Sequence, residues 1–304
     1  MRTNVTGAIA IALGVTFILL TTCGHKTGDQ LGGKVSSGEE RPPYYASPEI
    51  PDSLNFMGER VPLERFEVFE NLDREMLSNC YFHSQTLRLI KLAPRFFTII
   101  DPILKEEGVP ADFRYLAVAE SSLNPRALSP AGAAGIWQFL KGTAGDYGLE
   151  VNTEVDERYH LEKATRAACS YLRNSYRKYG SWALVAAAYN AGPASVDRQM
   201  ERQKTNGYFD LLLSEETERY VYRILSLKII IENPEKYGFR VSDEEKYPLL
   251  KTRKTEISGP VADLAAYANS LGITYKTLKY YNPWLRETQL TNKAGKRYQI
   301  EIPQ

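Results

Sequence analysis

The chain has 304 residues, which suggests a main domain with a smaller companion, and its 43% hydrophobic and 25% charged residues are ordinary for a globular protein. A formal net charge of only +1 at pH 7 argues against a nucleic-acid partner and against binding to an anionic membrane surface. The 3 histidines and 3 cysteines are scattered without a CxxC pair, so neither a metal nor another cofactor is expected, and no GxSxG, Walker or GxGxxG motif is present, which leaves carboxylate chemistry to consider.

The N-terminus has the pattern of an export signal. Arg2 precedes an apolar run at residues 8–20, which matches the hydrophobic region of a signal peptide and is shorter than a typical membrane span. The run leads into Leu-Thr-Thr-Cys, which resembles the bacterial lipobox, although Thr22 replaces the usual Gly or Ala. We predict a lipoprotein signal peptide at residues 1–22 and lipidation of Cys23. The alternative is an uncleaved anchor helix, because the uncharged stretch is longer than the apolar run.

Residues 23–51 have the composition of a flexible tether. They are rich in Gly, Ser, Pro and charged residues and have no apolar period. The residue after the cysteine, Gly24, is not the Asp that retains some bacterial lipoproteins at the inner membrane. We therefore expect a lipoprotein of the cell envelope that faces the periplasm from the outer membrane.

Residues 52–245 have a helical pattern. Apolar residues recur with the period of an α-helix in six segments that Gly and Pro residues separate. These segments are 64–77, 85–104, 111–121, 162–178, 181–189 and 215–231. Strand-like alternation is scarce, so we predict an all-α domain. Cys80 and Cys169 lie on its helical segments, either as a disulfide pair in an oxidising compartment or as two buried free thiols.

Glu120 closes an apolar stripe within the segment 111–121. Phe113, Leu116 and Ala117 share one helical face at spacings i, i+3 and i+4, and Glu120 follows at i+7. A carboxyl group on such a face is desolvated, which raises its pKa and lets it hold a proton near neutral pH. The alternative is that Glu120 is simply exposed at the helix end.

Three later segments combine polar residues with loops or helix ends. In the segment from Ser129 to Phe139, small residues allow a ligand to approach the backbone, and Gln138 is an amide within an apolar cluster, unless it only satisfies a loop carbonyl. The segment AYNAG ends a helix at Tyr189 and Asn190, as an ordinary capped helix also would. The segment ETERY begins a helix with acidic residues, which the helix dipole alone explains.

In this order, Glu120-Ser121, Ser129, GAAGIWQF, AYNAG and ETERY resemble the motifs of the family 1 soluble-type lytic transglycosylases, in particular the membrane-bound lytic murein transglycosylase D group. The resemblance extends over residues 55–240. It implies a mainly α, lysozyme-like helical domain related to goose-type lysozyme. It also implies an enzyme that cleaves the β-1,4 bond between N-acetylmuramic acid and N-acetylglucosamine in peptidoglycan glycan strands without consuming water.

The resemblance assigns the chemistry to one carboxyl group. Glu120 would protonate the glycosidic oxygen and then, as a base, accept the proton of the 6-hydroxyl of the muramic acid, which closes a 1,6-anhydro ring. Five positions would bind the substrate, namely Ser129, Gln138, Tyr189, Asn190 and Tyr220. Ser121 and Glu216 would have supporting, structural roles.

Residues 246–304 differ from the helical body in composition. The pattern predicts a strand at 254–258, helices at 261–270 and 275–281 and a closing strand at 297–303. This order resembles a LysM peptidoglycan-binding module, a small α+β unit. The first strand lacks the usual Gly-Asp-Thr start, so the alternative is a degenerate domain that packs against the catalytic body and supports it.

Three functions follow from these patterns. The first is a lipid-anchored lytic transglycosylase that acts as a monomer. The second is a muramidase that hydrolyses the same bond, for which Asp146, Asp156 and Glu216 are available as a second carboxylate, although residues 156–158 have the pattern of a surface ion-pair turn. The third is a non-catalytic peptidoglycan-binding lipoprotein, which the intact Glu120 and its motif set disfavour.

Overall fold

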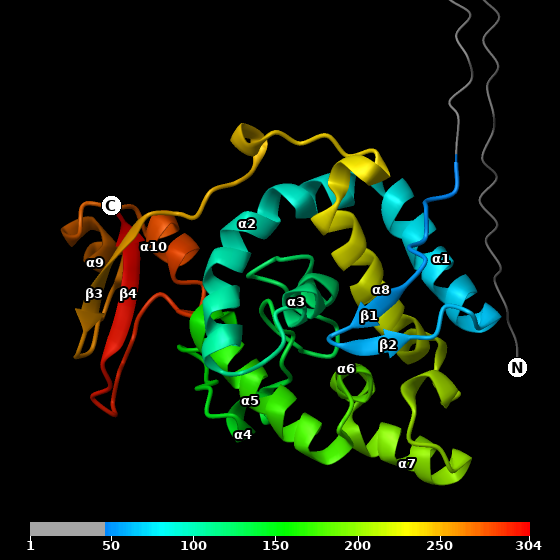
Figure 1. Ribbon diagram of the computed structural model, residues 1–304. Helices are drawn as coiled ribbons and strands as arrows, with labels where there is room; N and C mark the ends of the chain where they lie inside the picture. Colours follow the sequence, from blue (N-terminus) through cyan, green and yellow to red (C-terminus); the bar gives the residue numbers. More distant parts are fainter. Residues whose placement is uncertain (1–45) are drawn as a thin grey trace, which may run out of the picture. The chain divides into compact units, whose positions relative to one another are not determined.

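The computed structural model describes residues 46–304 (Figure 1). The predicted signal peptide at 1–22, the predicted lipidation site Cys23 and most of the predicted tether at 23–51 lie outside the described residues. Among the helices of residues 46–304, none combines the length and the hydropathy that a membrane span requires.

The described chain begins with a small hairpin. Strand β1 (Leu54–Phe56) pairs antiparallel with β2 (Glu59–Val61). Met57 and Gly58 form the turn with φ angles of 52° and 90°, the positive values that a two-residue hairpin turn requires. The prediction of an all-α domain omits this hairpin, because strands of three residues are too short for alternation to be recognised.

Eight α-helices follow in the described part of the helical body. They are α1 (Phe66–Tyr81), α2 (His83–Glu106), α3 (Phe113–Ser121), α4 (Lys141–Asp146), α5 (Leu161–Tyr179), α6 (Trp182–Ala191), α7 (Pro193–Gln203) and α8 (Glu215–Glu232). Short 3-10 helices occur at η1 (Glu157–Tyr159), η2 (Tyr208–Asp210), η3 (Pro234–Tyr237) and η4 (Asp243–Glu245). Each of the six predicted helices is present, with ends within a few residues of the prediction.

The helix α3 lies near the middle of this body, with α2, α5, α6 and α8 around it (Figure 1). The stripe that the sequence places on its inner face is buried: Phe113, Leu116 and Ala117 have no exposed side-chain surface. Burial of this stripe, at roughly 25 cal/mol per Å² of apolar surface, fixes the rotation of the helix about its axis. That rotation determines where Glu120 points.

The helices α6 and α7 meet at Gly192, and of these two helices only α6 was predicted from the sequence. The N–H group of Gly192 donates to the carbonyl of Ala188 and closes α6 (2.9 Å). Pro193 then begins α7 at its first position. Proline is favourable there, because its fixed φ suits a helix and the N–H group that it lacks would have no partner.

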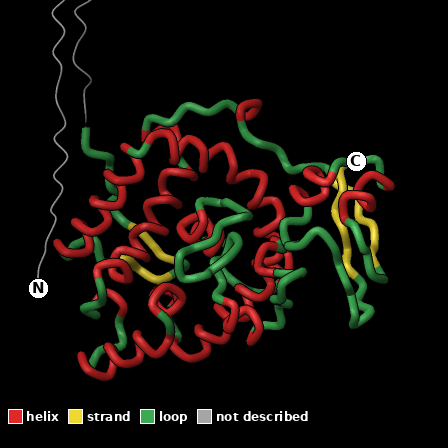
Figure 2. Tube along the Cα trace, turned by 180° about the vertical axis from the view of Figure 1, so that it is seen from behind, coloured by secondary structure: helices red, strands yellow, loops and turns green. Residues whose placement is uncertain are grey.

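The C-terminal module has the predicted order of strand, helix, helix and strand. It consists of β3 (Thr252–Ile257), α9 (Leu264–Ser270), α10 (Tyr275–Tyr281) and β4 (Tyr298–Pro303). The two strands pair antiparallel along their whole length, with Thr255 opposite Ile300 (Figure 2). The predicted fold class, a mainly α protein with a small α+β module, is confirmed.

The module shares its hydrophobic core with the helical body. Ala134, Val155 and Tyr159 of the body belong to the same buried cluster as Trp284 and Leu285 of the module. Backbone bonds cross the junction as well, from the N–H group of Asp156 to the carbonyl of Trp284 (2.9 Å) and from that of Arg286 to the carbonyl of Glu154 (2.7 Å). Residues 46–304 accordingly form one compact unit.

The two cysteines of the described chain are free thiols. Cys80 and Cys169 are buried and form no disulfide. Burial raises the pKa of the Cys80 thiol to about 11 and that of Cys169 to about 12, so both remain protonated and unreactive near neutral pH. Of the two alternatives from the sequence, the structure has the pair of buried thiols.

Candidate active site

Glu120 is the penultimate residue of α3. The helix ends because Ser122 and Leu123 adopt left-handed backbone angles, with φ of 52° and 54°. Leu123 is fully buried, and its burial offsets the cost of a conformation that non-glycine residues rarely adopt. The chain turns away sharply at this point and leaves the carboxyl group of Glu120 at the end of the helix, facing a cavity.

The carboxyl group of Glu120 is surrounded largely by protein. Burial raises its pKa from 4.5 to about 7, which is the largest effect on this group. A hydrogen bond donated by the Tyr220 hydroxyl and the positive charge of Arg223 act in the opposite direction, and the negative charge of Glu216 raises the pKa further. Near neutral pH the group is therefore present in both its protonated and its ionised form, as a residue that serves as acid and base requires.

A cavity of about 550 Å³ opens at Glu120. Six of the residues singled out from the sequence line it, namely Glu120, Ser129, Gln138, Tyr189, Asn190 and Glu216. They come from four places in the chain: the end of α3, the loop before α4, the end of α6 and the start of α8. Phe139 of the GAAGIWQF motif also lines the cavity, as do Thr143 and Tyr171, to which no sequence pattern points.

The loop at residues 127–140 forms one wall of this cavity. Bridges from Ala134 to Leu128 and to Phe139 fold it back on itself. The Ser129 hydroxyl accepts a hydrogen bond from the N–H group of Ala133 (3.0 Å). The side-chain amide of Gln138 donates to the carbonyl of Gly135 (2.7 Å), so Gln138 satisfies a loop carbonyl while it also lines the cavity.

Gly135 is required by the close approach of this loop to Arg158. Its φ is 76°, and a Cβ atom at this position would lie 1.9 Å from the backbone oxygen of Arg158. No side chain fits at that distance, because the obstacle is backbone rather than a movable group. The second glycine of GAAGIWQF, Gly135, is therefore required for steric reasons, whereas a Cβ atom at Gly132 would meet nothing within 4 Å.

Arg158 supports the loop from behind. Its guanidinium group donates to the carbonyls of Gly132 (2.8 Å) and Phe139 (3.1 Å), and Asp156 binds it through two further bonds of 2.9 and 2.6 Å. The ion pair predicted at residues 156–158 is present, but the prediction that it lies on the surface is wrong: Asp156 is 6% exposed and Arg158 is 8% exposed. The loop and the C-terminal module cover it, which local sequence cannot reveal.

The end of α6 contributes Tyr189 and Asn190. The Tyr189 hydroxyl donates to the carbonyl of Trp137 (2.6 Å), which ties α6 to the cavity loop. The side-chain oxygen of Asn190 accepts a hydrogen bond from the Thr217 hydroxyl of α8 (2.9 Å). Burial raises the pKa of the Tyr189 and Tyr220 hydroxyls well above their usual value, so both act as neutral donors.

The remaining predicted positions have other surroundings. Ser121 donates its hydroxyl hydrogen to the carbonyl of Ala117 (3.1 Å), as a helical serine commonly does. Asp146 is exposed, and neither it nor Asp156 lines the cavity, whereas the exposed Glu216 does. Within residues 46–304, no three His, Cys, Asp or Glu side chains form a group that could hold a metal ion.

Comparison with known families agrees with this arrangement. Residues 97–211 match the family model of the Transglycosylase SLT domain. The chain contains a transglycosylase SLT domain. Residues 253–304 match the Soluble lytic transglycosylase C-terminal LysM-like domain, so the SLT domain is followed by a LysM-like one. The SLT match ends before α8, the helix that carries Tyr220 and Glu216.

Curated relatives of this chain include proteins named as lytic murein transglycosylases. The "Membrane-bound lytic murein transglycosylase D" of Escherichia coli is 29% identical over 260 residues, which are 83% of this chain and 56% of that protein. The "Soluble lytic murein transglycosylase" of Salmonella typhimurium is 32% identical over 121 residues, or 36% of this chain and 19% of that protein. The chain thus spans little more than half the length of the first relative.

Among solved structures, the 70 kDa soluble lytic transglycosylase of Escherichia coli is 23% identical to this chain. The alignment covers 50% of this chain and 26% of that one, with a TM-score of 0.40.

Proposed function

We propose that this protein is a peptidoglycan lytic transglycosylase, and that Glu120 is its single acid and base. The observation that carries the proposal is the carboxyl group of Glu120, which has a pKa near 7, accepts a hydrogen bond from Tyr220 and faces a cavity lined by polar groups. The SLT domain and the relatives named as lytic murein transglycosylases support the substrate class.

In the first step, Glu120 acts as an acid. Its proton goes to the oxygen of the β-1,4 bond between N-acetylmuramic acid and N-acetylglucosamine, and the electron pair of the breaking carbon–oxygen bond goes to the same oxygen. The N-acetylglucosamine leaves as an alcohol, and an oxocarbenium-like species forms on the muramic acid. The raised pKa supports this role, because a carboxyl group with an ordinary pKa would have almost no proton to give at pH 7.

In the second step, the ionised Glu120 acts as a base. It accepts the proton of the 6-hydroxyl of the same sugar while that oxygen bonds to the anomeric carbon, which gives a 1,6-anhydro end. Glu120 is then protonated again and no water is consumed. An intramolecular hydroxyl held in line has a very high effective concentration, which favours it over water.

Four cavity residues are proposed to hold the sugars. Ser129, Gln138 and Asn190 supply polar side chains to the lining of the cavity, and the aromatic ring of Tyr189, which also lines it, packs against Tyr171 (ring centroids 5.1 Å apart). Tyr220 is proposed to orient the Glu120 carboxyl group rather than the substrate, since its hydroxyl is already bonded to Glu120.

A hydrolytic muramidase is the second candidate, because Glu216 lines the same cavity as Glu120. Glycosidases that hydrolyse their substrates usually use two carboxyl groups, and the second one activates water. Glu216 is exposed at the start of α8, so its side chain is not held in one position by surrounding protein, which supports a weaker role.

Product analysis distinguishes these functions. Purified peptidoglycan is digested with the wild-type chain and with Glu120→Gln and Glu216→Gln, and the products are identified by mass spectrometry. We expect 1,6-anhydro ends from the wild type and from Glu216→Gln, and a loss of at least about 100-fold in rate for Glu120→Gln with binding to peptidoglycan retained. If the wild type produces reducing ends and Glu216→Gln does not, the protein is a muramidase. If the wild type leaves the peptidoglycan unchanged, it is a non-catalytic lipoprotein.

The location follows as a further part of the proposal. The relative named membrane-bound and the Leu-Thr-Thr-Cys sequence support a lipid on Cys23 that anchors a monomer in the outer membrane, facing the periplasm. Fractionation of cells that produce the full chain or its Cys23→Ser variant tests the anchor. We expect the full chain in the membrane fraction and the variant in the soluble fraction, and a variant that stays with the membrane would contradict the lipid anchor.

A further inference from the structure

Glu75 is a buried carboxylate outside the cavity. It lies on α1, on the face that also carries Leu72 and Met76, and only 2% of its surface is exposed. A charged side chain is rarely buried to this extent unless it is paired, because desolvation of a lone charge costs several kcal/mol. The chemistry proposed for Glu120 makes no direct use of Glu75.

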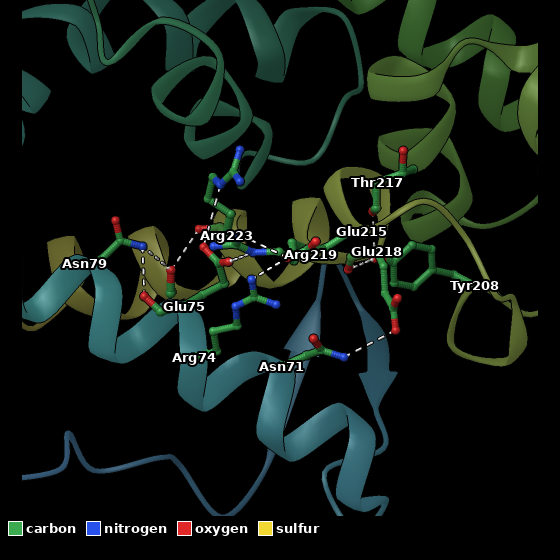
Figure 3. A network of polar contacts seen from close by, with 11 residues as sticks. Asn71, Arg74, Glu75, Asn79, Tyr208, Glu215, Thr217, Glu218, Arg219 and Arg223 are labelled. Atoms are coloured by element: carbon green, nitrogen blue, oxygen red, sulfur yellow. Dashed lines mark hydrogen bonds and ion pairs between the residues drawn. The ribbon is translucent and has the colours of Figure 1, made fainter.

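The partners of Glu75 are two arginines of α8 (Figure 3). Arg219 places its Nε atom 2.6 Å from one carboxylate oxygen, and Arg223 places its Nε atom 3.6 Å from the other. Arg219 and Arg223 are four residues apart and therefore occupy the same side of the helix. One carboxylate of α1 thus holds two successive turns of α8.

Other contacts of α8 reach the candidate active site. Tyr220 follows Arg219 and bonds to Glu120, and Thr217 bonds to Asn190. Glu216 lines the cavity itself. A rotation or shift of α8 would move all three groups together, so the contacts that fix α8 against α1 also fix the surroundings of Glu120.

We propose that Glu75 is a positioning residue for the Glu120 site, which it serves by fixing α8 against α1 and by compensating the positive charge of Arg223. This proposal rests on the proposed function, since it assumes that Glu120 is the acid. It assigns a role in the reaction to α1, which lies outside the segment that matches the SLT domain.

The electrostatic part of the proposal concerns the charges around Glu120. The groups that face it are Tyr220, Arg223 and Glu216 from α8 and Tyr189 from α6. From α2, Arg88 donates to the carbonyl of Ser122, just past the end of α3 (3.4 Å). Arg223 lowers the pKa of Glu120. Glu75 places a negative charge 3.6 Å from Arg223, and by Coulomb's law a negative charge there offsets part of the field of Arg223 at Glu120. Without Glu75, the ionised form of Glu120 would be favoured more strongly.

The pH dependence of activity tests this role. Because the acid must be protonated, kcat/KM falls as the pH rises through the pKa of Glu120. Glu75→Gln keeps an acceptor for Arg219 but removes the negative charge. We therefore expect the fall of kcat/KM at alkaline pH, the alkaline limb of the profile, to move to lower pH by roughly half a pH unit. Glu215→Gln is the matched control, since it removes another carboxylate beside Arg219 (3.7 Å) that is 69% exposed, and its profile should coincide with that of the wild type.

Arg223→Gln provides a second, opposite test that does not depend on the folding of Glu75→Gln. Removing the positive charge should move the alkaline limb to higher pH. A uniform loss of kcat/KM in Glu75→Gln with no movement of the limb, or movement of both variants in the same direction, would overturn the proposal. Full activity of Glu120→Gln would instead overturn the proposed function, so the two failures are distinguishable.

Discussion

At the scale of single residues, the raised pKa of Glu120 has a cost in stability. In the unfolded chain this carboxyl group has a pKa of 4.5, and in the folded protein about 7. The folded state therefore binds the proton more tightly, and its stability decreases as the pH rises from 4.5 through 7. Above pH 7 both states are ionised, and the folded protein is destabilised by about 3 kcal/mol relative to a chain without this shift.

Glu120→Gln should therefore stabilise the protein in a pH-dependent manner. Glutamine resembles the protonated carboxyl group and does not ionise, so the variant and the wild type should have similar free energies of unfolding near pH 4.5. At pH 8 the variant should be more stable by up to about 3 kcal/mol, as measured by urea unfolding. A constant difference between Glu120→Gln and the wild type across this pH range would contradict the prediction.

Glu120 and Glu75 carry the same signal in the sequence. Glu120 follows an apolar stripe, and Glu75 follows Val68 and Leu72 and precedes Met76 on the buried face of α1. Periodicity predicts that each carboxylate is buried. It does not reveal what neutralises the charge, because Arg219 is 144 residues away in the chain and the cavity at Glu120 is assembled from four segments.

At the scale of elements, helices were predictable where apolar residues repeat with the helical period. Helix α7 was not predictable, because Gly192-Pro193 also marks the end of α6. Helix α4 was not predictable either, because six residues are too few to show the helical period. The loop at 127–140 has no period at all. Its shape depends on Arg158, which is held by Asp156 and donates to two of the loop's carbonyls.

Arg158→Met should be strongly destabilising for this reason. The substitution leaves Asp156 as a buried charge without its partner and removes the donor for the carbonyls of Gly132 and Phe139, so we expect a loss of roughly 3–5 kcal/mol in urea unfolding. Arg60→Met is the control, because Arg60 pairs with Glu64 on the surface, and it should leave the urea midpoint nearly unchanged. Equal effects of the two substitutions would rule out the supporting role of Arg158.

At the scale of the whole described chain, the shared core joins the two matched domains. The ring of Trp284 stacks between His160 of the body and Tyr298 of the module, with ring centroids 5.9 and 5.6 Å apart. The order of elements in the module was predictable from its turns and its apolar strands. Its contact with residues 154–160 was not, since that surface carries no periodic pattern.

Trp284→Ala should lower the stability of the helical body as well as that of the module. Loss of this buried ring costs roughly 3–5 kcal/mol, and unfolding followed by far-ultraviolet circular dichroism, which reports mostly on the helices of the body, should shift to lower urea in one transition. Tyr280→Ala, at a side chain that is 50% exposed, should leave the midpoint nearly unchanged. Two separate transitions in Trp284→Ala, with the helical one at the wild-type midpoint, would mean that the parts fold independently.

The position of Ala134 restricts which C-terminal modules this helical body could accept. Ala134 is part of the cavity loop by its backbone bridges and part of the module's core by its side chain. In a chimera, a module from another protein would have to supply a ring in place of Trp284 and a carbonyl in position for the N–H group of Asp156. Without them, the cavity loop would lose the packing of Ala134 against the module. Body and module are therefore expected to be inherited, and to diverge, as a pair.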